Sequence, residues 1–316
     1  MIGIALAAML ASAAELPPAD IRTMIRDTRR VVGREGAAIW PGFQHADLAI
    51  DVIDAQTEYL FCTSSLPGFG QSQRDPVTGC GVQTRARTLP VDLSASFELL
   101  PGRQVVAIGT PAALAMDSPT WKLTMLHESF HQYQAGLTGY ADAVNAVRRA
   151  LGVTGADWAL SYAFPYADAG VMKAFATMTG AAHAFLIARD PATARTAVGN
   201  YVAARQAVAA IVGPKAWKYY EFQVGHEGVA RWTEIVLGES AARSDPALAA
   251  LAHDRRLGLA TSLRAIDTQG LGVWKRSVFY VLGAIEAEML ERERPGWRAD
   301  YIRTPFGLGQ QLAMLK

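Results

Sequence analysis

This sequence has very little cysteine and no excess of charge of either sign. The 316 residues include only two cysteines, and 30 basic residues are balanced by 29 acidic ones. No run of Lys or Arg is long enough to follow a phosphate backbone. The closest cases, at 29–34 and 255–256, have the spacing of exposed helix faces. We therefore expect no nucleic-acid partner.

Long hydrophobic runs are also lacking after the first residues. The longest later candidate, 174–188, contains His183 and is shorter than the roughly 18 apolar residues of a membrane helix. Residues 1–14 are uncharged, apolar and end in small residues, as in a secretory signal peptide, although the basic start is missing. We predict a signal peptide at 1–14, a periplasmic or secreted protein, and no membrane span in the mature chain. The alternatives are a buried N-terminal helix or a start codon assigned too late.

The two cysteines, Cys62 and Cys80, have no Cys or His companion at metal-ligand spacing. In an exported protein they are expected to pair. The closed loop would then contribute on the order of 3 kcal/mol in the chain-entropy model. In a cytosolic protein they would instead be two unpaired thiols.

The order of hydrophobic patterns predicts an α+β protein. Half of the residues are apolar, which argues against disorder. Segments 21–32 and 46–55 have helical periodicity, and short runs between Thr57 and Gly109 predict three to five strands. After Pro119 the pattern is helical, interrupted at Gly or Asp-Pro positions near 152–155, 190–191, 213–214, 245–246 and 270–272. We therefore expect a small N-terminal β-sheet followed by a mainly helical catalytic region.

One short motif carries the chemistry. Residues 127–131 read His-Glu-Ser-Phe-His, which places His127 and His131 on one face of a helix, where both imidazoles can reach one metal ion. Glu128 can then hold a water molecule beside the metal and take its proton. The alternative is a helix with two hydrogen-bonded histidines and no metal.

A catalytic zinc needs a third protein ligand. Four candidates lie downstream, namely Glu221, His226, Glu227 and Glu234. The run Glu-Gly-Val-Ala-Arg-Trp-Thr-Glu at 227–234 resembles a segment of the gluzincin metallopeptidases, as in the aminopeptidase N group. That resemblance implies Glu227 as the third ligand. Glu234 lies two turns further on the same helix face, which suggests a role behind the ligands.

A second segment shows the same resemblance. Phe-Tyr-Val-Leu-Gly-Ala at 279–284 is similar to the family's Tyr-x-x-Gly-Ala element, whose tyrosine steadies the oxyanion. This implies that role for Tyr280, against the alternative of an aromatic side chain in a helix core. Gln132 and Tyr133, after the second histidine, also match the family pattern.

The resemblance is confined to segments 124–136, 225–238 and 277–287. Between His131 and Glu227 lie 95 residues (132 to 226), where the family has a short helical hairpin. We therefore expect a helical insert at about 137–215 within a single zincin-like domain at 15–316. His226 replaces the family's usual asparagine, and no counterpart of the Gly-Ala-Met-Glu-Asn element is present, so aminopeptidase activity is not expected.

These observations predict a zinc-dependent hydrolase, specifically a peptidase acting on peptides or proteins. Zn²⁺ would be held by His127, His131 and Glu227, with Glu128 as general base and Tyr280, or additionally His226, stabilising the oxyanion. Segment 104–109 is a candidate edge strand for the peptide. Two alternatives remain: an exported zinc-binding protein without activity, and a metal-free helical protein with a coincidental motif.

Overall fold

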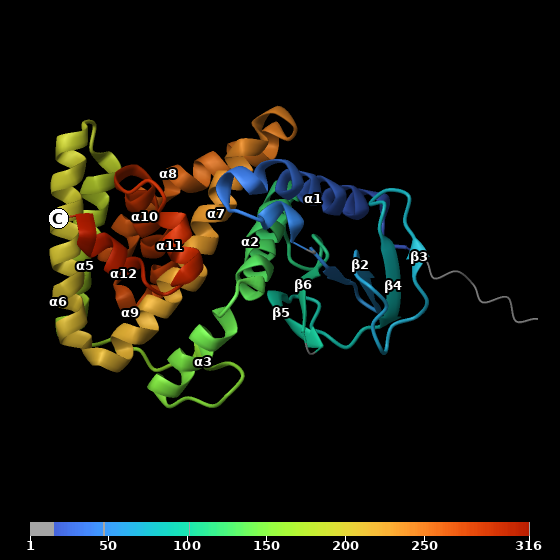
Figure 1. Ribbon diagram of the computed structural model, residues 1–316, viewed down its shortest axis with the longest axis horizontal. Helices are drawn as coiled ribbons and strands as arrows, with labels where there is room; N and C mark the ends of the chain where they lie inside the picture. The colour runs from blue at the N-terminus through green and yellow to red at the C-terminus, as the bar shows by residue number, and fades with distance from the viewer. Residues whose placement is uncertain (1–15, 47, 101, 316) are drawn as a thin grey trace, which may run out of the picture.

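The computed structural model describes residues 16–46, 48–100 and 102–315. The predicted signal peptide at 1–14 lies outside these residues. A small sheet and its covering helix form one end of the molecule, and helices form the rest (Figure 1). This arrangement confirms the predicted α+β class, with the sheet in the N-terminal part.

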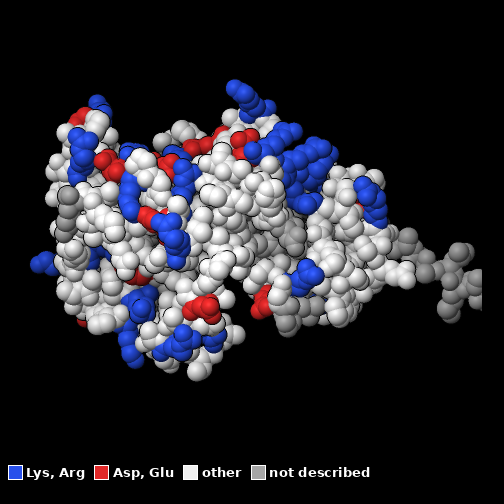
Figure 2. Space-filling model, in the orientation of Figure 1, with Lys and Arg blue, Asp and Glu red and all other residues white. Residues whose placement is uncertain are grey.

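The N-terminal helix α1 (Ala19–Ile39) includes the helical segment predicted at 21–32. Its apolar side packs on the sheet, where Ile21 and Ile25 join Val52 and Trp121 in one buried cluster. The opposite side of α1 carries arginines, and Figure 2 shows basic side chains gathered over this helix. A short 3₁₀ turn (Phe43–His45) leads from α1 to the sheet.

The sheet has six strands in the order β3-β4-β2-β1-β6-β5. Their bounds are β1 (Ile50–Ile53), β2 (Thr57–Phe61), β3 (Gln73–Arg74), β4 (Gly81–Ala86), β5 (Ser94–Leu100) and β6 (Arg103–Gly109). Strands β2, β4, β5 and β6 coincide with the short runs expected between Thr57 and Gly109. A disulfide joins Cys62, just after β2, to Cys80, just before β4.

The helix expected at 46–55 is wrong, because this segment contains strand β1. All four residues of β1 are buried. The strand pairs antiparallel with β2 and parallel with β6, so it lies in the middle of the sheet. Tertiary pairing on both sides decides the conformation of so short an apolar segment, whose periodicity fits either a helix or a strand.

The expectation that 104–109 forms the edge strand is also wrong. Strand β6 lies between β1 and β5. The hairpin that joins β5 to β6 adds β5 outside it, with Ser94 opposite Ile108. The free edge on this side of the sheet is therefore β5, which also contacts helix α2.

Helices occupy most of the remaining chain. Their bounds are α2 (Ser118–Gly136), α3 (Tyr140–Leu151), α4 (Trp158–Ser161), α5 (Ala169–Ile187), α6 (Pro191–Gln223), a π-helical turn η2 (Val224–Gly228), α7 (Val229–Ser240), η3 (Ala241–Arg243), α8 (Pro246–Gln269), α9 (Leu271–Trp274), α10 (Ser277–Glu293), α11 (Trp297–Arg303), α12 (Leu308–Leu312) and η4 (Ala313–Leu315).

The predicted helix breaks lie at or near observed boundaries. Asp190 and Asp245 each accept a hydrogen bond from a backbone N–H in the first turn of the helix that follows. Gly213 has φ 78° and produces a kink inside α6, immediately before Pro214.

The stretch predicted as a helical insert holds α3, α4, α5 and most of α6. Helix α6 is joined to α10 by a buried network in which Arg205 bonds both oxygens of Glu221 at 2.7 Å and Glu286 at 2.9 Å. Helix α5 packs along α6 and α8. By length and composition alone, α5 is also the one helix in the described ranges that could cross a membrane.

Candidate metal centre

Helix α2 carries both histidines of the sequence motif. It begins, as expected, close to Pro119, and the carboxylate of Asp117 accepts the backbone N–H of Thr120 at 2.9 Å. Every residue from position 121 to 134, except Thr124, is buried. The one-turn spacing puts His127 and His131 on the same face, with ring centroids 4.8 Å apart.

Glu227 reaches the histidines from the π-helical turn η2, which inserts one extra residue per turn at this point. Such turns are frequent at functional sites because they reorient a side chain within a continuous helix. Two glycines of the turn stand where neighbouring backbone is closest. A Cβ atom at Gly225 would lie 2.4 Å from the carbonyl oxygen of Pro305, and one at Gly228 would lie 2.4 Å from the Cα of Gly283.

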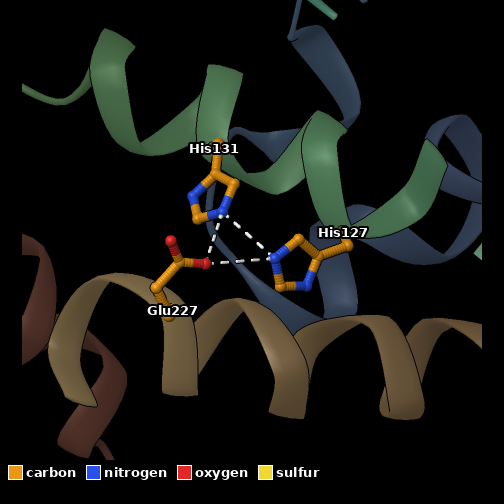
Figure 3. Close-up of side chains that lie close together, drawn as sticks. All are labelled: His127, His131 and Glu227. Carbon is orange, nitrogen blue, oxygen red and sulfur yellow. Dashed lines mark hydrogen bonds and ion pairs between the residues drawn. The ribbon is translucent and has the colours of Figure 1, made fainter. Parts of the chain in front are cut away.

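Three potential ligand atoms converge between α2 and η2 (Figure 3). The Nε2 atoms of His127 and His131 are 3.1 Å apart, and the Oε2 of Glu227 lies 3.4 and 3.3 Å from them. All three residues are buried. Zinc bonds of about 2.0–2.1 Å in a tetrahedron place neighbouring ligand atoms about 3.3 Å apart. The group could therefore hold a metal ion.

The second nitrogen of each imidazole has its own acceptor. Nδ1 of His127 is 2.8 Å from Oε2 of Glu234, and Nδ1 of His131 is 2.7 Å from Oε1 of Gln134. The Gln134 amide nitrogen donates to the His226 carbonyl and the Tyr301 hydroxyl, so its oxygen must be the acceptor. Nδ1 of His131 is thus a donor, and the ion pair with Glu234 favours a proton on Nδ1 of His127, so both Nε2 atoms can present lone pairs to one point.

Two lone pairs and a carboxylate that face one another require a cation between them. A proton on His127 is one solution. Burial lowers the pKa of His127, but hydrogen bonds with Glu227 and Glu234 outweigh it and raise the pKa to about 9. Burial likewise opposes ionisation of Glu227, yet both histidines hold its pKa well below the usual range. A metal ion is the other solution, and it competes with that proton.

Three arginines stabilise the carboxylates of this centre. Arg276 donates to Oε1 of Glu227 at 2.9 Å, which directs the other oxygen towards the histidines. Arg231 and Arg255 both donate to Oε1 of the fully buried Glu234, at 2.6 and 2.7 Å. These contacts keep both carboxylates ionised and oriented.

The two residues predicted to act in catalysis border the group. Glu128 is 8 % exposed, and no residue in the described ranges hydrogen-bonds its carboxylate. Its charge raises the pKa of both His127 and Tyr280, so it lies near them. The Tyr280 ring stacks on the His127 ring at 5.9 Å, and burial followed by the charge of Glu227 raises its pKa.

The other candidate ligands lie outside the group. Glu221 pairs with Arg205 in the network between α6 and α10, and Glu234 contacts Nδ1 of His127, on the side of the ring away from the group. Nδ1 of His226 is hydrogen-bonded to the Tyr140 hydroxyl at 2.7 Å, and its ring lies 4.3 Å from that of His131. Burial and then the charge of His131 lower the pKa of His226 to about 3.

Some supporting residues were not predicted from the sequence. Gln134 lies three residues after His131, a helical spacing that could have identified it. Arg276 precedes Tyr280 by four residues, but nothing in the sequence connects it to Glu227. Tyr140 and Tyr301 come from distant helices and carry no such signal.

The molecular surface is hollowed below α2, between the segment with α3 and the segment with β5 (Figure 2).

Comparisons with protein-family models, curated proteins and solved structures found no match to this chain.

Proposed function

We propose that this protein is a zinc-dependent hydrolase that cleaves peptide bonds. The observation that carries the proposal is the convergence of two Nε2 atoms and one carboxylate oxygen at 3.1–3.4 Å, with an oxygen atom within 2.8 Å of each Nδ1. A His, His, Glu set with these separations suits zinc better than calcium or magnesium, which prefer oxygen ligands. Zinc, when bound, supplies Lewis-acid polarisation of a carbonyl and lowers the pKa of water.

Glu128 is the general base in this proposal. It follows His127 directly on α2, and its carboxylate makes no hydrogen bond or ion pair within the described part of the chain. The carboxylates of Glu227 and Glu234, by contrast, are paired with arginines and with the histidines. Glu128 is therefore the carboxylate that can accept a proton from water and later deliver it to the leaving amine. A purely structural metal site would need no such free carboxylate.

Tyr280 is the proposed oxyanion donor. Its raised pKa keeps the phenol protonated at neutral pH, so the hydroxyl can donate a hydrogen bond as negative charge develops on the carbonyl oxygen. The ring stack on His127 fixes its position beside the group. His226 is a weaker candidate, since its Nδ1 is already bonded to Tyr140.

A peptide substrate suits the free edge of the sheet. Within the described ranges, strand β5 has no neighbouring strand on its outer side, and it contacts α2, so an extended peptide can add to it along the helix that carries the histidines. Export is part of the same proposal. The disulfide between Cys62 and Cys80 is of the kind that persists in oxidising compartments, such as the periplasm or the extracellular space.

The proposal is tested with a mixed peptide library and zinc-supplemented protein, with cleavage read by mass spectrometry. Wild type should cleave a subset of the peptides, and Glu128→Gln should bind zinc equally but lose at least about a hundredfold in rate. Gln keeps the shape of the side chain and removes only its ability to accept the proton. A variant that retains most of the activity would exclude Glu128 as the base.

A further inference from the structure

A pocket lined by arginines adjoins the metal centre. It has a volume of about 540 Å³ and lies between α7, α8, α9 and the start of α10. The residues that matter here are Arg231, Arg255, Arg276, Trp274, Ser262 and Tyr280. Among the residues that the structure describes, none of the side chains that line it is acidic.

The pocket shares two walls with the metal group. Tyr280 lines the pocket and also stacks on His127 at 5.9 Å. Arg276 lines the pocket and also donates to the Glu227 carboxylate at 2.9 Å. Only the side chains of Tyr280 and Arg276 therefore separate a group bound in this pocket from the predicted metal ligands.

The charges of the pocket are only partly compensated. Arg231 and Arg255 share a single carboxylate oxygen of Glu234, which lies behind the wall and is 1 % exposed. Arg276 pairs with Glu227, whose carboxylate also pairs with the two histidines. Three cations thus border the pocket against two carboxylates that already serve other partners.

The arginines also keep donors for a ligand. Within the described ranges, each of the three donates one hydrogen bond, from Nη1, although a guanidinium carries five N–H groups. The side chains of Arg231, Arg255 and Arg276 are each a quarter or more exposed. Planar guanidinium groups bind carboxylates in two-point geometry, which is stronger than a single neutral hydrogen bond.

We propose that this pocket binds a carboxylate of the substrate and that it determines specificity. The carboxylate belongs either to the C-terminus of a peptide or to an acidic side chain. The claim that the carboxylate belongs to a peptide substrate rests on the proposed function. Binding of a carboxylate in the pocket requires no catalysis.

Binding is measured by titration calorimetry with two matched pairs of probes. N-acetyl-leucine and N-acetyl-leucinamide differ in a C-terminal carboxylate. The α-amides of N-acetyl-glutamate and N-acetyl-glutamine differ in a side-chain carboxylate. At least one carboxylate probe should bind about tenfold or more tightly than its neutral partner, and higher salt should weaken it. The pair that responds identifies the source of the carboxylate.

The measurements are made on zinc-loaded and on chelator-treated protein, because a carboxylate can also bind a metal directly. Binding in the pocket should persist without zinc. Arg255→Gln should reduce it about tenfold or more, while Arg231 still bonds Glu234. The matched control is Arg256→Gln, one residue further on α8, whose side chain pairs with Glu239 and Glu288 outside the pocket.

Equal binding of charged and neutral probes would overturn the inference, and so would binding that Arg255→Gln and Arg256→Gln leave equally unchanged. If peptides are cleaved without any preference for a carboxylate, the pocket inference fails and the hydrolase stands. If carboxylates bind but no zinc and no cleavage is found, the hydrolase proposal fails and the pocket stands.

Discussion

Gly228 and Gly283 pack backbone against backbone where η2 crosses α10. A Cβ atom on Gly228 would lie 2.4 Å from the Cα of Gly283, and one on Gly283 would lie 2.6 Å from the carbonyl oxygen of Val224. At this contact the turn that carries Glu227 packs directly on the helix that carries Tyr280. Both glycines belong to the segments with a family resemblance, and their lack of a side chain permits the two backbones to lie this close.

Gly228→Ala should therefore lower both the stability of the fold and the affinity of the centre for zinc. The backbone at Gly228 is helical, with φ −69°, so alanine causes no backbone strain there. The cost comes from the steric clash of its methyl group with the facing backbone of α10. We expect the free energy of unfolding to fall by about 1–3 kcal/mol, measured by urea denaturation. Zinc affinity should fall as well, because Glu227 moves with the turn.

The matched control is Gly199→Ala in α6, where a Cβ atom meets nothing within 4 Å. That variant should be neutral or more stable by about 0.5–1 kcal/mol, since alanine is the better helix former. Equal effects of the two substitutions would contradict the role given to the glycine contact.

The histidine pair could be predicted because it depends on local geometry alone. A spacing of four on a helix fixes the relation of His127 to His131 whatever the remaining fold. Glu227 is 96 positions beyond His131, and spacing could not select it among its neighbours. Only the resemblance distinguished it from Glu221, which is bonded to Arg205.

The wrong predictions concern pairing between distant segments. Segment 50–53 became a strand because β2 and β6 border it, and β6 lost the edge because β5 folds back outside it. Neither relation leaves a local pattern in the sequence. The arginines of the pocket were equally hidden, since they come from α7, α8 and the start of α10.

Glu234→Gln tests the support behind the first histidine. The carboxylate forms ion pairs with His127 Nδ1, at 2.8 Å, and with Arg231 and Arg255. Loss of its charge should reduce zinc affinity about 10–100-fold, measured by competition with a chelator. Glu239→Gln on the same helix removes an equivalent charge that pairs with Arg256, and should leave zinc affinity unchanged. Equal affinity in both variants would remove Glu234 from this role.

Zinc affinity should depend on pH through His127. In the metal-free centre its pKa is raised to about 9, so at pH 7 the ring is protonated and metal binding must displace that proton. The apparent affinity should rise about tenfold per pH unit between pH 7 and 8.5 and level off above pH 9. Calorimetry in buffers of different ionisation enthalpy should detect the released proton at pH 7. A flat affinity profile would contradict the proton competition.

Asp51 should make the fold less stable at high pH. It is buried in β1 with no hydrogen-bond donor for its carboxylate in the described ranges. Burial and the nearby Glu58 raise its pKa to about 7. The folded protein thus binds a proton that the unfolded chain loses near pH 4, so the free energy of unfolding falls as pH rises towards 7.

The measurement is urea denaturation of wild type and Asp51→Asn from pH 4 to 8. The substitution should remove a fall of up to about 1.4 kcal/mol per pH unit, so the variant gains on wild type as pH rises. The exposed Asp92→Asn serves as control and should follow wild type. Parallel pH profiles for wild type and Asp51→Asn would show that Asp51 is not the group responsible.

The central claim is tested most directly by elemental analysis of the purified protein after dialysis, in three forms. Wild type and Glu239→Ala should each retain about one zinc per chain, and Glu227→Ala should lose most of it. Glu239 lies on the helix that follows Glu227 and pairs with Arg256, so it controls for the loss of a carboxylate. No zinc in the wild type after supplementation, or full retention by Glu227→Ala, would contradict the account.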